Sequence, residues 1–201
     1  MTDGNTDILK FDAGGIASLL AGSRDVSTFL NRTVERIAQA LTTDVCSIYL
    51  YNDVTDRLEL RATHGLTPTA VGVVQLALGE GIVGKALEAR RPILADCASQ
   101  HPDYHYFSET GEEPFECFLA FPILRGVERI GVLALQRRVG NPFHNDEVRT
   151  VRLISSQLAS AIDNVRAFQQ VTAAAPAPVA APQPAMILIK GLPVSPGLII
   201  G

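Results

Sequence analysis

The sequence has few cysteines, no long hydrophobic run and no excess of basic residues, and each shortage excludes a class of protein. Only three of the 201 residues are cysteines, and their odd number and wide spacing argue against a disulfide framework or a paired-cysteine metal site. No apolar run approaches the roughly 18 residues that a membrane helix needs, and the N-terminus shows no signal-peptide pattern. The net charge is -4, without the basic stripe that nucleic-acid binding favours. We therefore expect a soluble, cytoplasmic protein that binds neither nucleic acid nor membrane.

Hydrophobic residues form 47% of the chain, which suffices for a core, and their spacing predicts the elements. Apolar residues from Leu30 to Leu41 recur at helical spacing and predict a helix that begins at Val26, with Asp25 or Ser27 as its N-cap. A second stripe predicts a closing helix over residues 146–168. Short helices are expected over 16–20 and 81–90, and strands over 45–51, 57–63, 73–78, 93–95, 117–124 and 129–136. A sheet enclosed between terminal helices predicts an α+β domain.

The apolar stripes of the two long terminal helices allow two interpretations. They either form only the core, or one of them also forms a homodimer interface, because their spacing is similar to a coiled-coil seam. The spacing alone does not separate the two.

Five segments carry a resemblance to a known family. They are TDVCSIYL at 43–50, ATHGL at 62–66, GEGIVG at 79–84, FPI at 121–123 and IGVL at 130–133. Together with the closing helix they resemble a GAF domain over residues 26–168. The tail at 190–201, KGLPVSPGLIIG, resembles the opening of the phosphoenolpyruvate-utilising region of Enzyme I. A GAF domain followed by that opening resembles the nitrogen-type Enzyme I family, the phosphoenolpyruvate–protein phosphotransferases.

The resemblance implies a GAF fold, with a six-stranded antiparallel sheet, helices on both faces and a small-molecule pocket on the loop side. It also implies a parent enzyme that phosphorylates its own histidine from phosphoenolpyruvate with magnesium and passes the phosphoryl group to a histidine-containing carrier. That chemistry and its magnesium are expected outside this chain, which would hold no cofactor and serve the downstream domains as a regulatory input. The expected segments are an N-terminal segment over 1–25, the GAF domain over 26–170, an Ala/Pro-rich linker over 171–185 and the start of the next domain over 186–201.

The long loop over 96–115 is the expected ligand-binding segment, because loops of this length inside compact domains are usually functional. The resemblance suggests an amino-acid-like ligand, with glutamine the first candidate. Such a zwitterion needs an ammonium acceptor, for which Asp96 ranks first and Glu112 second, and backbone N–H groups near 81–84 could take its carboxylate. Along 117–123 we expect Cys117, Leu119, Phe121 and Ile123 to face the pocket. The full expected lining is Tyr49, Asp96, Cys97, Tyr104, Phe107, Glu112, Phe115, Cys117, Leu119 and Phe121. The alternative is a pocket filled by side chains in a module that serves dimerisation or structure.

Three further patterns have a functional and a structural interpretation, and the structural one is preferred for each. Gly79, Gly81 and Gly84 fit the dinucleotide fingerprint, but that fingerprint needs a parallel βαβ unit; shaping the entry to a helix fits better. His101 and His105 have the spacing of metal ligands on a helix, without further ligands to complete a site, so no metal is expected. The segment over 141–147 is similar to a cyclic-nucleotide motif but lacks its lysine, and it fits a helix cap at His144 or Asn145.

Overall fold

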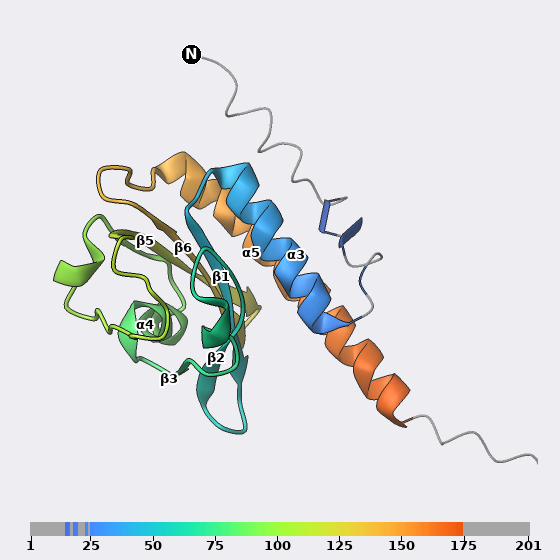
Figure 1. The fold of residues 1–201 in the computed structure, drawn as a ribbon. Coiled ribbons are helices and arrows are strands. Elements are labelled where there is room, and N and C mark those ends of the chain that lie inside the picture. Colours follow the sequence, from blue (N-terminus) through green and yellow to red (C-terminus); the bar gives the residue numbers. More distant parts are fainter. Residues whose placement is uncertain (1–14, 17, 20–22, 24, 175–201) are drawn as a thin grey trace, which may run out of the picture.

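Six antiparallel strands form one sheet through the middle of the protein, as Figure 1 shows for a computed structural model that describes residues 15, 16, 18, 19, 23 and 25–174. The order across the sheet is β3-β2-β1-β6-β5-β4, and every neighbouring pair is antiparallel. The strands are β1 (Val45–Asn52), β2 (Arg57–His64), β3 (Gln75–Ala77), β4 (Ile93–Ala95), β5 (Cys117–Arg125) and β6 (Glu128–Arg137). The predicted sheet and all six predicted strands are confirmed.

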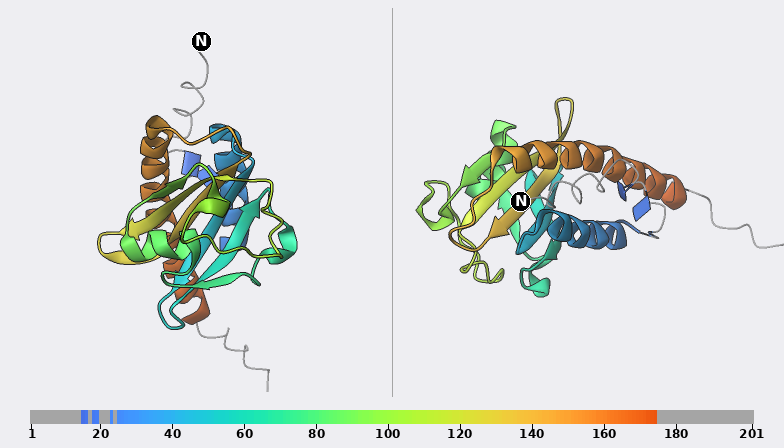
Figure 2. Two further views of the ribbon diagram at one scale, coloured as in Figure 1. Left: turned by 90° about the vertical axis from the view of Figure 1, so that its left-hand side faces the viewer. Right: turned by 90° about the horizontal axis from the view of Figure 1, so that it is seen from above.

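Helices cover both faces of the sheet, as expected from the resemblance. The long helices α3 (Val26–Leu41) and α5 (Asn145–Ala174) lie side by side on one face. The opposite face carries α4 (Gly81–Ala89), the short 3-10 helices η1 (Pro68–Ala70) and η2 (Ala98–Gln100), and the loops between them, which the two views of Figure 2 show from the side and from above. No helix among the described residues is long and apolar enough to cross a membrane.

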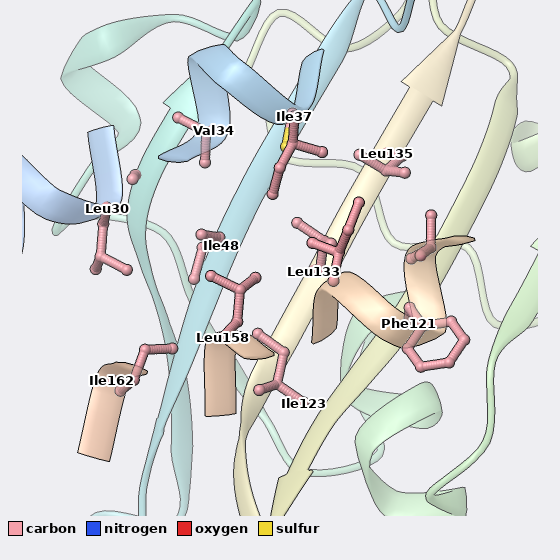
Figure 3. Close-up of a cluster of buried hydrophobic side chains, with 14 of the residues drawn as sticks. Leu30, Val34, Ile37, Ile48, Phe121, Ile123, Leu133, Leu135, Leu158 and Ile162 are labelled. Atoms are coloured by element: carbon pink, nitrogen blue, oxygen red, sulfur yellow. The ribbon is translucent and has the colours of Figure 1, made fainter. Parts of the chain in front are cut away.

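The apolar stripes of α3 and α5 are buried against the sheet within one chain. Leu30, Val34 and Ile37 of α3 and Leu158 of α5 have no exposed surface, and Figure 3 shows them over the strands in one cluster. Burying a side chain of this size contributes roughly 1.5–3 kcal/mol. The fold itself therefore uses these residues of both stripes as core.

Both long helices begin at polar residues that satisfy free backbone N–H groups. Asp25 is the N-cap of α3, since its Oδ1 accepts a hydrogen bond from the Thr28 N–H at 2.8 Å, which confirms one of the two predicted caps. At α5, Glu147 Oε2 accepts from the His144 N–H at 2.9 Å, as the third helical residue does in a capping box. These contacts fix where each helix leaves the preceding loop.

The closing helix is longer than predicted. The backbone of α5 is helical to Ala174 rather than Phe168, so the first four residues of the expected linker, 171–174, are helical. Thirty residues span about 45 Å at 1.5 Å per residue, and the helix continues past the edge of the sheet (Figure 1). Residues 16, 18 and 19 of the predicted N-terminal helix are helical, as is residue 15 just before it, while residues 175–201, with the remaining linker and the expected next domain, lie outside the described residues.

Candidate ligand cavity

A small cavity lies between the sheet, the start of α4 and the loop that precedes β5, and we refer to it as the α4 cavity. Its volume is about 20 Å³, which is space for about one water molecule. The lining combines apolar walls with a carboxyl group, two phenols and an imidazole. The lining residues are Tyr49, Leu76, Gly81, Ile82, Val83, Tyr104, His105, Phe107, Glu112 and Phe118.

Glu112 is the buried acid of the α4 cavity, with 8% of its surface exposed. Its Oε2 accepts a hydrogen bond from Gln136 Nε2 at 3.0 Å. Burial raises the pKa of the Glu112 carboxyl above its ordinary value, while the bond from Gln136 and one from the Phe107 N–H oppose that rise. Within the described part of the chain no lysine or arginine forms an ion pair with it. Its hydrogen bonds come from neutral donors, and the charge of His105 also lowers its pKa; a buried acid without a lysine or arginine partner favours a cation as its next neighbour.

Two tyrosine hydroxyls face the same space. Tyr49 is only 5% exposed, yet its hydroxyl makes no hydrogen bond to the described residues. Burial, followed by the nearby Glu112 charge, raises the pKa of Tyr49. The same two causes, with burial again the larger, raise the pKa of Tyr104 to about 12. Both phenols consequently stay protonated at neutral pH and are available as hydrogen-bond donors.

The N-terminus of α4 borders the α4 cavity through Gly81, Ile82 and Val83. No side chain caps this helix: the residue at the N-cap, Glu80, uses its Oε2 to accept from the Ala77 N–H at 2.7 Å instead. The first N–H groups of a helix have no partner inside the helix and carry the positive end of its dipole. The α4 cavity is thus lined by both a carboxyl group and a helix N-terminus.

The glycines that resemble a dinucleotide fingerprint shape this turn, as the structural interpretation predicts. Gly81 has φ of +65°, where L side chains are strained. A Cβ on Gly84 would lie 2.6 Å from the Ala77 carbonyl oxygen. The helix that follows connects the two edge strands of an antiparallel sheet, not two neighbouring parallel strands, so the βαβ unit that the fingerprint requires is absent from the described residues.

Four of the ten predicted lining residues meet at the α4 cavity, namely Tyr49, Tyr104, Phe107 and Glu112. The predicted face of β5 is wrong. Leu119 and Phe121 lie in the cluster beneath α3 and α5, in which Figure 3 labels Phe121, whereas Phe118 lines the α4 cavity. The alternation is right but its phase is shifted by one residue, which exchanges the two faces.

The remaining predicted residues lie away from the α4 cavity. Asp96 is exposed, so of the two predicted acceptors Glu112 lies at the α4 cavity and Asp96 does not. The Asp96 carbonyl accepts a weak hydrogen bond from Cys117 Sγ at 3.4 Å. Cys97 Sγ donates to Glu116 Oε2 at 3.4 Å, and Phe115 lies with its ring centroid 5.4 Å from the Arg138 guanidinium carbon. Asp96, Cys97, Phe115 and Cys117 thus contact neighbouring residues outside the cavity and do not line it.

Sequence reasoning missed Gln136 and the cavity role of His105. Gln136 is a buried polar residue that directly follows the apolar stretch 130–135 of β6, and such an interruption is the signal that could have pointed to it. His105 packs on Phe107 with ring centroids 4.6 Å apart, and its Nδ1 lies 3.7 Å from Glu80 Oε1. His101, the other histidine of the pair with metal-ligand spacing, accepts a hydrogen bond from the Asp103 N–H at 3.2 Å. In the described ranges no three histidine, cysteine or acidic side chains come together as a metal site.

Comparison with known proteins agrees with this architecture. The sequence model of the GAF domain matches residues 23–163. The chain belongs to the GAF domain family. It is 36% identical over 110 residues to the Escherichia coli phosphoenolpyruvate-dependent phosphotransferase system protein, a match that covers 55% of this chain and 15% of that protein. The chain is also 25% identical over 152 residues to the nitrogen fixation protein AnfA of Azotobacter vinelandii, covering 74% of the chain and 28% of the relative.

Two solved structures of phosphotransferase GAF domains superpose on this one. The GAF domain from the Coxiella burnetii phosphoenolpyruvate-protein phosphotransferase is 30% identical, with a TM-score of 0.75 and coverage of 84% of this chain and 99% of that chain. The corresponding domain from Acinetobacter is 27% identical, with a TM-score of 0.71 and coverage of 85% and 99%. The GAF domain described here therefore resembles those of phosphoenolpyruvate–protein phosphotransferases, while spanning only about 15% of the curated relatives' length.

Proposed function

We propose that this GAF domain is the regulatory, small-molecule-sensing part of a nitrogen-type phosphoenolpyruvate–protein phosphotransferase. Its likeness to GAF domains of such enzymes in sequence and structure supports the assignment. The parent would carry phosphoryl from phosphoenolpyruvate, with magnesium, to a histidine-containing carrier. The chain itself then acts as an input and performs no phosphoryl transfer.

The ligand we propose is amino-acid-like, with glutamine the first candidate. One observation carries this proposal: a buried carboxylate without a cationic partner, Glu112, faces the same cavity as the uncapped N-terminus of α4. A zwitterion carries the two complementary charges, an ammonium for Glu112 and a carboxylate for the helix N-terminus. The unpartnered hydroxyl of Tyr49 and the hydroxyl of Tyr104 supply further hydrogen bonds for a polar side chain.

Binding requires the loop before β5 to move, because the space enclosed in this conformation holds little more than one water molecule. That loop contributes Tyr104, His105, Phe107 and Glu112, so the residues that would hold the ligand also close over it. A ligand that favours the opened arrangement shifts the population of the two states. A tenfold shift needs only about 1.4 kcal/mol of differential binding.

The small volume also favours a second candidate, a GAF domain whose cavity stays filled by its own side chains and whose role is structural. Calorimetric titration of the chain with glutamine and with 2-oxoglutarate, up to millimolar concentrations, separates the two. We expect heat of binding with glutamine and a rise of the melting temperature, since a ligand at 100 times its Kd stabilises the folded state by about 2.7 kcal/mol. The absence of binding by both compounds would leave the structural role.

A further inference from the structure

We propose that Glu112 is the specificity-determining residue of the α4 cavity and makes it select ligands that carry a protonated amine over the matching acids without one. This proposal rests on the function proposed above, that the cavity binds a small molecule. It adds a rule of selection: the ammonium group, rather than the carboxylate or the amide, decides which metabolite binds.

The acids around Glu112 are already engaged elsewhere. Glu113 accepts a hydrogen bond from the Tyr106 hydroxyl on the exposed side of the loop. Glu116 accepts from the Ser99 N–H at 3.0 Å, and Glu80 accepts from the Ala77 N–H. Of the acids in this loop and at the start of α4, Glu112 is the one that is buried and lines the cavity. A cationic group entering the space therefore meets a single carboxylate.

Among the described residues, the groups that pack against Glu112 include no lysine or arginine that would balance its negative charge. Gln136 from β6 donates one hydrogen bond, and the Phe107 N–H gives another. Tyr49 from β1 and Tyr104 from the same loop are neutral phenols. His105 Nδ1 lies 3.7 Å from Glu80 Oε1, and the charge of His105 also lowers the pKa of Glu112. A charged donor adds Coulomb attraction to its hydrogen bond with a carboxylate, which a neutral donor does not. An ammonium group supplies that donor.

A ligand without the ammonium is disfavoured for two reasons. It leaves the Glu112 charge without a cation in a space from which water has been displaced, and it adds its own negative charge at short range. A dicarboxylate such as 2-oxoglutarate brings two charges of the wrong sign. The α4 N-terminus can accept one carboxylate, but its partial positive charge does not offset repulsion from Glu112.

The test compares glutamine with 4-carbamoylbutanoate, which has the same carboxylate and amide but a hydrogen in place of the ammonium. Both are titrated by calorimetry into the wild-type chain, Glu112→Gln and Glu113→Gln. Glu113→Gln is the matched control, because it makes the same change at the next residue, whose side chain is exposed and outside the cavity. We expect the wild type and Glu113→Gln to prefer glutamine by at least tenfold. Glu112→Gln should bind glutamine roughly 30-fold more weakly or worse and lose the preference.

The outcomes separate the two proposals. If the wild type binds both compounds equally, or Glu112→Gln retains the affinity for glutamine, the selection rule is wrong while the sensing function stands. If neither compound binds the wild type, the sensing function and the selection rule fail together. Circular dichroism confirms that each variant is folded. Should Glu112→Gln not fold, the comparison of the two compounds on the wild type decides the selection rule alone.

Discussion

Arg137 and Glu147 form an ion pair that fastens the end of β6 to the first turn of α5. The Arg137 side chain is only 5% exposed, its Nη1 donates to Glu147 Oε2 at 3.3 Å, and its Nη2 donates both to Glu147 Oε1 and, at 2.6 Å, to the Leu41 carbonyl at the end of α3. Its Cζ lies 4.4 Å from the centroid of the Phe143 ring. One guanidinium thus joins both long helices to the sheet.

Replacing Arg137 should cost much more stability than replacing its neighbour. Arg137→Met leaves Glu147 without a cation and the Leu41 carbonyl without its donor, so we expect a loss of about 3 kcal/mol in the free energy of unfolding. Arg138→Met is the control, since this side chain is 68% exposed and lies 3.7 Å from Asp44; it should cost less than about 1 kcal/mol. Urea unfolding of both variants checks this. Equal losses would show that the contacts of Arg137 add nothing beyond a surface charge.

A change of pH should alter the contribution of Glu112 to stability in the opposite direction to that of a carboxylate in an ion pair. Because its pKa is raised in the folded state, the folded protein holds this proton more tightly than the unfolded chain does. The contribution to stability is therefore full below the ordinary value of 4.5 and is lost as the pH rises through the folded pKa. Relative to the wild type, Glu112→Gln should gain stability as the pH increases through that window. Denaturant midpoints measured from pH 4 to 8 test the sign.

A matched comparison comes from Glu113, whose pKa is lowered, chiefly by the hydrogen bond from Tyr106. Its contribution is present above the ordinary value and is lost as the pH falls through the folded pKa. Glu113→Gln should consequently lose relative stability as the pH rises, the reverse of Glu112→Gln. The same slope in both variants would contradict the assignment of Glu112 as the buried, uncompensated acid.

Removing the Tyr49 hydroxyl should affect the ligand more than the fold. Tyr49→Phe deletes a hydroxyl that makes no hydrogen bond to the described residues and is not among their buried unpaired polar atoms, so the free energy of unfolding should change by less than about 1 kcal/mol. Glutamine affinity should fall several-fold. Tyr51→Phe, which loses a bond of 2.5 Å to Asp56 on the exposed turn, should leave the affinity unchanged. Calorimetry and urea unfolding of both variants check this, and an unaltered affinity in Tyr49→Phe would remove that hydroxyl from the site.

The contact between β6 and β1 should not tolerate a side chain at Gly131. A Cβ there would lie 2.0 Å from the Tyr49 carbonyl oxygen, so the two strands must separate beside the α4 cavity. Gly131→Ala should lose about 3 kcal/mol or more, at the upper end of overpacking effects. Gly126→Ala meets no atom within 4 Å and carries only the strain of φ at +59°, about 1 kcal/mol. Thermal unfolding compares the two variants, and a smaller loss of stability in Gly131→Ala than in Gly126→Ala would contradict the close approach of the two strands.

The sequence predicts this fold well because its helices and strands carry distinct spacings. The stripe from Leu30 to Leu41 and the alternation along β2 predict the ends of α3 and β2 to within one residue. The phase of β5 is different, because the strand is buried on both faces from Cys117 to Ile123. Neither face is then marked by polar residues, and the side that meets the helices depends on packing between distant segments.

The candidate site is less predictable for a related reason. Asp96 and Glu112 lie at opposite ends of one long loop, and the path of that loop in space decides which acid turns inward. Gln136, which holds Glu112, comes from a strand 24 residues farther along the chain. Composition identifies both acids as candidates, but only the folded arrangement shows that one is exposed and the other buried.

The most direct test of the sensing function is a glutamine titration followed by amide NMR of the chain. We predict that the shifted signals are those of the α4 cavity: the backbone amides of Gly81, Ile82 and Val83, the backbone amide of Phe107 and the side-chain amide of Gln136. Shifts that saturate at these positions support binding between Glu112 and the start of α4. No shift at millimolar glutamine, or shifts confined to residues outside the cavity, would contradict it.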